Sequence, residues 1–107
     1  MTRIPRLTAA MVAILHVLLD ANDDDPHWGL RICEQAKLGP GTVYPALDRL
    51  TVADWVSSTW EGEYSAPRPR RRLYQLTPEG RTAATAALQA KAAAKLHWRP
   101  AAAGGIA

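Results

Sequence analysis

Residues 39–50 constrain the fold of this chain more than any other segment. The segment opens with a proline between two glycines and then changes to the spacing of a helix. Val43, Leu47 and Leu50 recur at positions i, i+4 and i+7, which places one apolar stripe along that helix. Residues 41–44 would form an exposed N-terminal end with unpaired N–H groups and partial positive charge, and such an end attracts phosphate.

Two prolines leave the start of this helix open. Pro40 suits the first helical position, where its missing N–H costs nothing, and Gly39 suits the N-cap. Pro45 removes one backbone hydrogen bond when it lies inside a helix, and it can kink the helix axis. Either the helix begins ahead of Pro45 with a distorted first turn, or its regular part begins at Pro45.

The same segment resembles the recognition helix of the PadR family of bacterial transcriptional regulators. That helix typically contains Pro-Gly-Thr-(Leu/Val)-Tyr-Pro-x-Leu-x-Arg-Leu, and residues 40–50 match it as Pro-Gly-Thr-Val-Tyr-Pro-Ala-Leu-Asp-Arg-Leu. The family's wing ends in Arg/Lys-Tyr-x-Leu-Thr, and residues 72–77 resemble this ending. The resemblance covers about residues 8–90. It implies a winged helix-turn-helix that dimerises on double-stranded DNA and acts as a transcriptional repressor.

The rest of the chain is expected to supply the other elements of this fold. We expect a first helix from Thr8 to about Leu19, a second from Pro26 to Ala36 with Asp25 as its N-cap, strands over residues 55–61 and 70–76 around a turn at 62–69, and a last helix from Pro78 to about Trp98 with Thr77 as its N-cap. In the second helix, Leu30 and Cys33 are expected to face the core. Asp54 stands where the family usually has glycine, so the recognition helix is expected to end in a different shape.

The predicted fold class is mainly α with a small β-hairpin: a winged helix-turn-helix plus a C-terminal dimerisation helix. Residues 1–76 would form the DNA-binding domain, residues 77–98 the dimerisation helix and residues 99–107 a flexible tail. The last helix is rich in alanine, which favours helix formation and lets a second helix approach closely. Larger family members carry a multi-helix C-terminal domain at this point, and we expect a short form without it.

Two surfaces are predicted to contact DNA. The first is the N-terminal end of the recognition helix with the arginine one turn further on: Gly41, Thr42, Tyr44, Pro45 and Arg49. The hydroxyls of Thr42 and Tyr44 can donate hydrogen bonds to phosphates or base edges. Two alternatives compete with this interpretation. Arg49 pairs with a nearby aspartate (Asp48 or Asp54), or Tyr44 belongs to the core.

The second surface is a cluster of four arginines at the wing: Arg68, Arg70, Arg71 and Arg72. Arginines at a wing tip can contact the DNA backbone or a narrow minor groove, whereas the competing interpretation is that the cluster serves solubility alone. The charge distribution favours a polyanion partner. Residues 67–107 hold eight basic residues and one acidic residue, while residues 1–66 hold five basic and nine acidic.

No catalytic constellation is visible in the sequence, so we expect no enzyme activity, no catalytic residues and no cofactor. Metal ligands are not expected either, because Asp23, Asp24 and Asp25 lack the alternating spacing and the distal glutamate of a calcium loop. The single cysteine, Cys33, favours a reducing compartment, with redox sensing as an alternative role. No signal peptide or membrane-spanning segment is expected, so we predict a cytoplasmic bacterial protein.

Two further hypotheses stay open on the sequence alone. The chain could instead be a winged-helix protein-interaction module, or an architectural DNA-binding protein without sequence preference. In addition, some PadR-family members bind an aromatic small-molecule effector between subunits. Candidate residues for stacking on such an effector are Trp28, Trp55, Trp60 and Trp98, although packing in a core or an interface is the ordinary role of a tryptophan.

Overall fold

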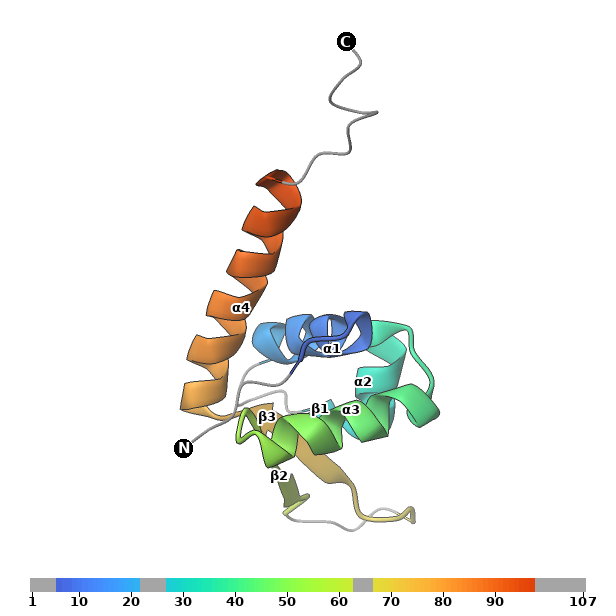
Figure 1. The fold of residues 1–107 in the computed structure, drawn as a ribbon. Coiled ribbons are helices and arrows are strands. Elements are labelled where there is room, and N and C mark those ends of the chain that lie inside the picture. Colours follow the sequence, from blue (N-terminus) through green and yellow to red (C-terminus); the bar gives the residue numbers. More distant parts are fainter. Residues whose placement is uncertain (1–5, 22–26, 63–66, 98–107) are drawn as a thin grey trace.

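A computed structural model describes residues 6–21, 27–62 and 67–97 of the chain. The elements follow one another as α1 (Ala9–Asp20), β1 (His27–Trp28), α2 (Gly29–Ala36), α3 (Pro40–Val52), β2 (Val56–Trp60), β3 (Arg72–Leu76) and α4 (Pro78–His97). Figure 1 shows α1, α2 and α3 gathered into one body, with the sheet against it and α4 extending away. The chain is mainly helical with a small antiparallel sheet, which confirms the predicted fold class, while the dimerisation role of the last helix stays a prediction.

The three helices and the sheet share one hydrophobic core. Ile14 from α1 and Ile32 from α2 are fully buried in it. The predicted apolar stripe of α3 is buried as well, because Val43, Leu47 and Leu50 all lie in the same cluster. Burial of apolar surface stabilises the fold by about 25 cal/mol per Å². The helix therefore turns this apolar stripe toward the core and leaves its opposite face exposed to solvent. That outer face carries the residues predicted to contact DNA.

The second helix begins later than the sequence predicted. We expected it to start at Pro26, but α2 begins at Gly29, and His27 and Trp28 form strand β1 instead. β1 pairs antiparallel with β3, which gives a three-stranded sheet of order β1-β3-β2. Pairing with this distant strand holds the two residues extended and overrides their local helical pattern. Pro26 and its predicted cap Asp25 lie outside the described residues.

The buried stripe of α2 consists of Gly29, Ile32 and Cys33, so it differs in part from the predicted one. Cys33 is buried as predicted, and desolvation raises the pKa of its thiol. A raised pKa lowers the thiolate population that oxidation requires. Leu30 was predicted to face inward, but it is 59% exposed because it lies in the first turn of α2 and lines a surface groove toward the wing.

Helix α3 settles the question that its two prolines left open. The helix begins at Pro40 with Gly39 as its N-cap, and it continues through Pro45. Of the two alternatives, the helix therefore begins ahead of Pro45. The missing N–H of Pro45 leaves the carbonyl four residues earlier without its helical partner, and that carbonyl belongs to Gly41.

The other end of α3 departs from our expectation. Asp54 adopts the left-handed conformation, with φ of 63°, that suits the glycine found there in the family. The amides of Asp54 and Trp55 donate to the carbonyls of Thr51 and Leu50, each at 3.0 Å. These two bonds make a Schellman end, so the predicted change of shape is wrong and aspartate accepts the strain of the left-handed position instead.

Strands β2 and β3 form the predicted hairpin. They pair antiparallel from Val56 opposite Leu76 to Trp60 opposite Arg72. We call these two strands and the loop of residues 61–71 between them the wing. Within the loop, residues 63–66 lie outside the described part of the chain.

Helix α4 is capped as predicted, because the amide of Gly80 donates to the hydroxyl of Thr77 at 2.8 Å. Its first turns pack on the core through Ala84, while residues 89–95 are exposed and project from the body (Figure 1). Residues 98–107, which include Trp98 and the predicted tail, lie outside the described residues, as do residues 1–5. Among the helices that the structure describes, none has the length and apolarity needed to cross a bilayer.

Candidate nucleic-acid interface

The outer face of α3 carries every residue of that helix that we predicted to contact DNA. All five are exposed: Gly41, Thr42, Tyr44, Pro45 and Arg49. The first turn offers fewer free amides than the sequence suggested, because the amide of Thr42 donates to the carbonyl of Gly39 at 3.1 Å and Pro40 has no N–H. The side-chain hydroxyls of Thr42 and Tyr44 are therefore the main donors at this end of the helix.

Tyr44 lies at the edge between α3 and α2, not in the core. Its side chain is 37% exposed, and its ring lies against Gly29, where a Cβ would sit 2.1 Å from the phenolic oxygen. Gly29 thus leaves the space that the tyrosine ring occupies. Partial burial raises the pKa of Tyr44, so the phenol remains a hydrogen-bond donor at neutral pH.

Arg49 is exposed one turn further along α3. The structure shows no hydrogen bond or ion pair from its side chain to Asp48 or Asp54 within residues 6–21, 27–62 and 67–97. The competing interpretation, in which a neighbouring aspartate holds this arginine, therefore has no support in the described residues. Its charge lies on the solvent-exposed side of α3.

The four arginines of the wing have different surroundings. Arg68 forms a two-point ion pair with Glu61, with nitrogen–oxygen distances of 2.9 and 3.0 Å. The guanidinium of Arg71 lies over the Trp28 ring at 3.8 Å from its centroid, which is a cation–π contact between the wing and β1. The solubility interpretation does not account for such contacts, because a cluster that only keeps the chain in solution needs no specific partners.

Arg70 and Arg72 are the two wing arginines with exposed side chains. Nε of Arg72 donates to the Ser58 hydroxyl at 3.0 Å, and its guanidinium lies 5.1 Å from the centroid of the Trp60 ring. These contacts orient Arg72 while its charge stays accessible. The two residues are thus the wing arginines best placed to meet a phosphate.

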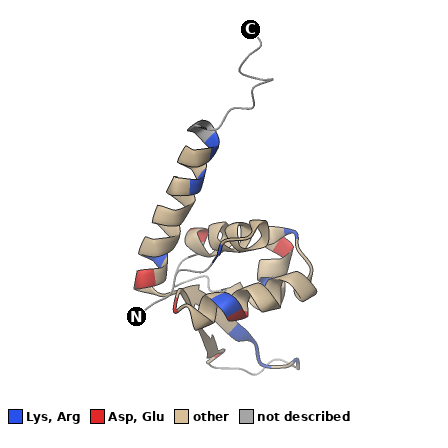
Figure 2. Cartoon of the chain, viewed as in Figure 1, with Lys and Arg blue, Asp and Glu red and all other residues tan. Residues whose placement is uncertain are grey.

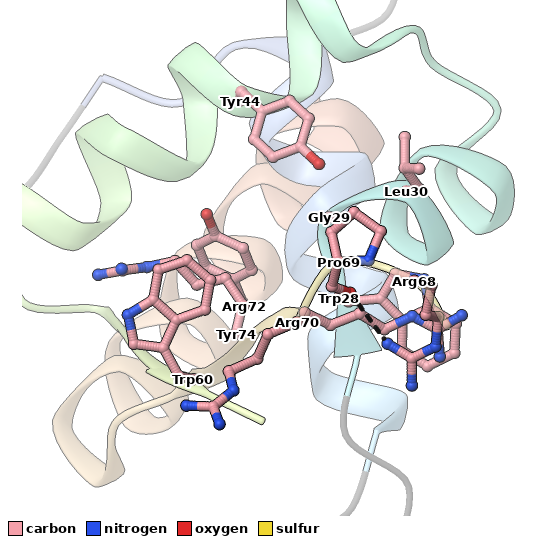
Figure 3. A pocket seen from close by; sticks show the side chains of 11 residues that line it. Trp28, Gly29, Leu30, Tyr44, Trp60, Arg68, Pro69, Arg70, Arg72 and Tyr74 are labelled. Carbon is pink, nitrogen blue, oxygen red and sulfur yellow. Dashed lines mark hydrogen bonds between the residues drawn. The ribbon is translucent and has the colours of Figure 1, made fainter. Parts of the chain in front are cut away.

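A groove of about 420 Å³ separates the wing from the N-terminal ends of α2 and α3. Figure 3 shows the side chains that line it: Trp28, Gly29, Leu30, Tyr44, Trp60, Arg68, Pro69, Arg70, Arg71, Arg72 and Tyr74. The groove brings together Tyr44 and all four predicted arginines, which come from two separate predicted surfaces. The remaining predicted residues, Gly41, Thr42, Pro45 and Arg49, lie on α3 outside the lining of the groove.

Sequence reasoning missed part of this groove. Leu30 was assigned to the core, and neither Gly29 nor Tyr74 was singled out as a site residue. Glu61, which pairs with Arg68 beside the groove, was also missed. No local signal identifies these positions, because the pairing of β1 with β3 brings Gly29 and Leu30 toward Tyr74, and the β2–β3 hairpin brings Glu61 to Arg68.

The candidate tryptophans divide between core and groove. Trp55 is 1% exposed and belongs to the core, so packing is its role. Trp28 lies under Arg71, whereas Trp60 is 56% exposed at the end of β2. Trp98 lies outside the described residues. Of the three tryptophans that the structure describes, Trp60 therefore offers the most surface to an external partner.

The electrostatics of the wing agree with a polyanion partner. Figure 2 shows lysine and arginine along the wing and on α4, with few acids on the wing. Within the described part of the wing, Glu61 has a lowered pKa because Arg68 donates hydrogen bonds to its carboxylate. In the described part of the chain, no three His, Cys, Asp or Glu side chains are grouped to hold a metal ion. The acidic run Asp23–Asp25 lies outside that part.

Comparison with known proteins agrees with this geometry. The family model described as "Transcriptional regulator PadR-like family" matches residues 14–86. Among solved structures, a PadR family transcription regulator from Clostridium difficile has 26% identity and a TM-score of 0.67, with 82% of this chain and 92% of that chain covered. A PadR-like transcription factor from Bacteroides fragilis has 26% identity and a TM-score of 0.63, with coverage of 79% and 82%.

A third structure shares the fold alone. ZitR from Lactococcus lactis has 24% identity and a TM-score of 0.60, and the match covers 79% of this chain. The chain spans 53% of the length of that protein. No curated protein sequence matches the chain significantly. The family model nevertheless covers well over half of the residues, including α2, α3 and both strands of the wing, so the chain belongs to the PadR-like family of transcriptional regulators.

Proposed function

We propose that the chain is a dimeric, sequence-specific transcriptional repressor that binds a palindromic DNA operator. The observation that carries this proposal is the groove between α3 and the wing. It places the hydroxyl of Tyr44 opposite several guanidinium groups, with aromatic rings between them (Figure 3). Hydroxyl donors, arginines and aromatic surface are the groups that proteins use on phosphates, sugars and bases.

Each part of this surface has its own role in the proposal. The N-terminal half of α3 enters the major groove, where Thr42 donates to a base edge or meets a thymine methyl with its own methyl group. Arg70 and Arg72 contact the backbone or minor groove beside it. The DNA strand between these two grooves then crosses the space between α3 and the wing. Arg49, which is exposed one turn further along α3, contacts a phosphate as well.

The dimer in this proposal forms through α4, with residues 1–76 as the DNA-binding domain and residues 77–98 as the dimerisation helix. The exposed second half of α4 supports this assignment, because it is rich in alanine and projects from the body. Small side chains let two helices approach closely. Two-fold symmetry then requires two half-sites about 34 Å apart, or a multiple of that distance. Repression would follow from occlusion of a promoter.

Thr42 gives the sharpest test of sequence-specific recognition. Replacement of Thr42 by alanine should weaken binding to the preferred site by about 1–3 kcal/mol and change binding to random duplexes little, because a lost base contact matters only where the right base is present. Fluorescence anisotropy titrations on both DNAs measure the difference. Equal losses on the two DNAs would mean that Thr42 contacts the backbone and reads no base.

A protein-interaction or architectural role is the alternative, and DNA binding that is insensitive to Thr42 and to sequence would favour it.

An aromatic effector of the kind that some family members bind would stack on Trp60, which is the exposed tryptophan at the groove. The proposed function also places the protein in the bacterial cytoplasm, where its DNA is.

A further inference from the structure

We propose that Glu61 is a positioning residue for DNA binding, because its carboxylate braces the loop of the wing in the conformation that presents Arg70 and Arg72. The inference rests on the proposed function, since it assigns a role within the same interface. It separates Glu61 and three of the wing arginines into two groups. Glu61 and Arg68 hold the loop, while the exposed arginines meet the DNA.

The contacts of Glu61 reach across the whole loop. Nη1 and Nη2 of Arg68 donate to its two carboxylate oxygens at 2.9 and 3.0 Å. The backbone amide of Arg71 donates to the same carboxylate at 3.4 Å, and the amide of Glu61 donates back to the carbonyl of Arg71 at 2.8 Å. One residue at the end of β2 is thus tied to positions seven and ten residues later.

The hydrogen bonds of Glu61 hold the two ends of the loop together beyond the last paired residues of β2 and β3. Regular pairing of β2 with β3 ends at Trp60 opposite Arg72, and the bond from the Glu61 amide to the Arg71 carbonyl extends it by one step into the loop. A loop without such ties loses more conformational entropy when it docks. The two-point pair also commits the Arg68 guanidinium to Glu61, with Nη1 donating in addition to the Pro69 carbonyl at 3.2 Å. Arg68 therefore shapes the loop.

Removal of the Glu61 charge should have opposite effects on DNA binding in two cases: one in which Glu61 holds the loop, and one in which it acts only through its negative charge. A carboxylate beside a phosphate backbone repels it, so removal of its charge should tighten binding if the charge is all that matters. If Glu61 holds the loop, removal of its charge should weaken DNA binding. The loop of the free protein would then be less ordered, and the entropy lost when it becomes ordered on DNA would reduce the affinity. The lowered pKa of Glu61 keeps the carboxylate charged at neutral pH, so both effects are present in physiological buffer.

The test compares the full chain with three variants. Glu61→Gln keeps the size of the side chain but replaces one acceptor oxygen by a donor group that faces the donors of Arg68. Glu34→Gln makes the same change of net charge at an exposed position of α2 and serves as the control. The double variant Glu61→Arg with Arg68→Glu reverses the pair while the net charge stays the same.

Two measurements are needed. Fluorescence anisotropy gives the Kd for duplex DNA, and hydrogen exchange gives the protection of the Glu61 and Arg71 amides in the free protein. We expect Glu61→Gln to bind DNA roughly threefold to tenfold more weakly, with faster exchange at both amides and an unchanged thermal midpoint. Glu34→Gln should bind equally or slightly more tightly. The reversed pair should recover most of the lost affinity.

Binding of Glu61→Gln that equals or exceeds that of the wild type, with unchanged exchange, would overturn the proposal. A lower thermal midpoint that accounts for the weaker binding would also overturn it, since Glu61 would then serve the global fold. If the wild-type chain binds no DNA, the proposed function fails on its own. The exchange rates would still decide whether Glu61 braces the loop.

Discussion

Replacement of Gly80 by alanine should destabilise the fold by about 3 kcal/mol, although alanine is the better helix former by about 1 kcal/mol. Gly80 lies in the first turn of α4, against the backbone of Trp55. A Cβ at this position would lie 2.0 Å from the Trp55 carbonyl oxygen, 2.6 Å from its carbonyl carbon and 2.7 Å from its Cα. Such distances are far inside van der Waals contact, so one backbone must move.

Neither backbone can move easily. The Trp55 side chain is buried in the core, and its carbonyl accepts from the amide of Thr77 at 3.0 Å. The hydroxyl of Thr77 donates to the Asp54 carbonyl at 2.7 Å. The start of α4 is thus fixed on the Schellman end of α3, and a displacement of α4 breaks these bonds. The steric cost therefore outweighs the gain in helix propensity.

Thermal unfolding followed by circular dichroism measures this effect. A loss of about 3 kcal/mol should lower the midpoint by more than about 10 °C in a domain of this size. Gly41→Ala is the matched control, because Gly41 lies in the first turn of α3 and a Cβ there meets nothing within 4 Å. It should leave the midpoint unchanged or raise it. Equal midpoints for the two variants would show that α4 does not dock on Trp55 as the structure has it.

The double replacement of Arg70 and Arg72 by alanine should weaken DNA binding about a hundredfold at moderate salt. A hydrogen bond between charged groups is worth about 1.5–3 kcal/mol, and we assign one phosphate to each arginine. Both side chains are exposed on the wing, and Ser58 and Trp60 orient Arg72 toward the groove. Since each phosphate contact releases counterions, each lost contact should also reduce the slope of log K against log salt by about 0.9.

Anisotropy titrations at several salt concentrations give both quantities. Lys91→Ala combined with Lys95→Ala removes the same charge from the exposed half of α4 and serves as the control. A slope that falls by about 1.8 in the wing variant and stays nearly constant in the control would assign two phosphates to the wing. The same slope in both double variants would mean that the wing contributes only diffuse charge.

Local sequence signals predicted most of the elements. The Pro-Gly opening of α3, the Thr77-Pro78 start of α4 and the alternation of β3 each depend on neighbouring residues, so the boundaries that they predicted agree with the structure to within a few residues. The apolar stripe of α3 determined its buried face for the same reason. Because that face is buried, the five residues of the helix that were predicted to contact DNA lie on the exposed side.

The parts that the sequence did not predict depend on distant contacts. His27 and Trp28 are extended because β3 pairs with them, more than forty residues further along the chain. Leu30 lies off the buried stripe of α2 and faces outward. The ion pair between Glu61 and Arg68 also depends on the closure of the hairpin, which composition alone does not reveal. The sequence therefore located the wing arginines but did not separate those that shape the loop from those left exposed.

Selection of bound sequences from a pool of random duplexes, at two salt concentrations, shows whether the chain recognises a specific DNA sequence as a dimer. We expect the full chain to enrich a palindrome whose half-sites are about 34 Å apart, and we expect binding to weaken as salt rises. Such a palindrome would identify the operator and support both the recognition role of α3 and the dimer. Salt-sensitive binding with no enriched sequence would contradict sequence-specific recognition, and the absence of binding at both salt concentrations would contradict the proposed function altogether.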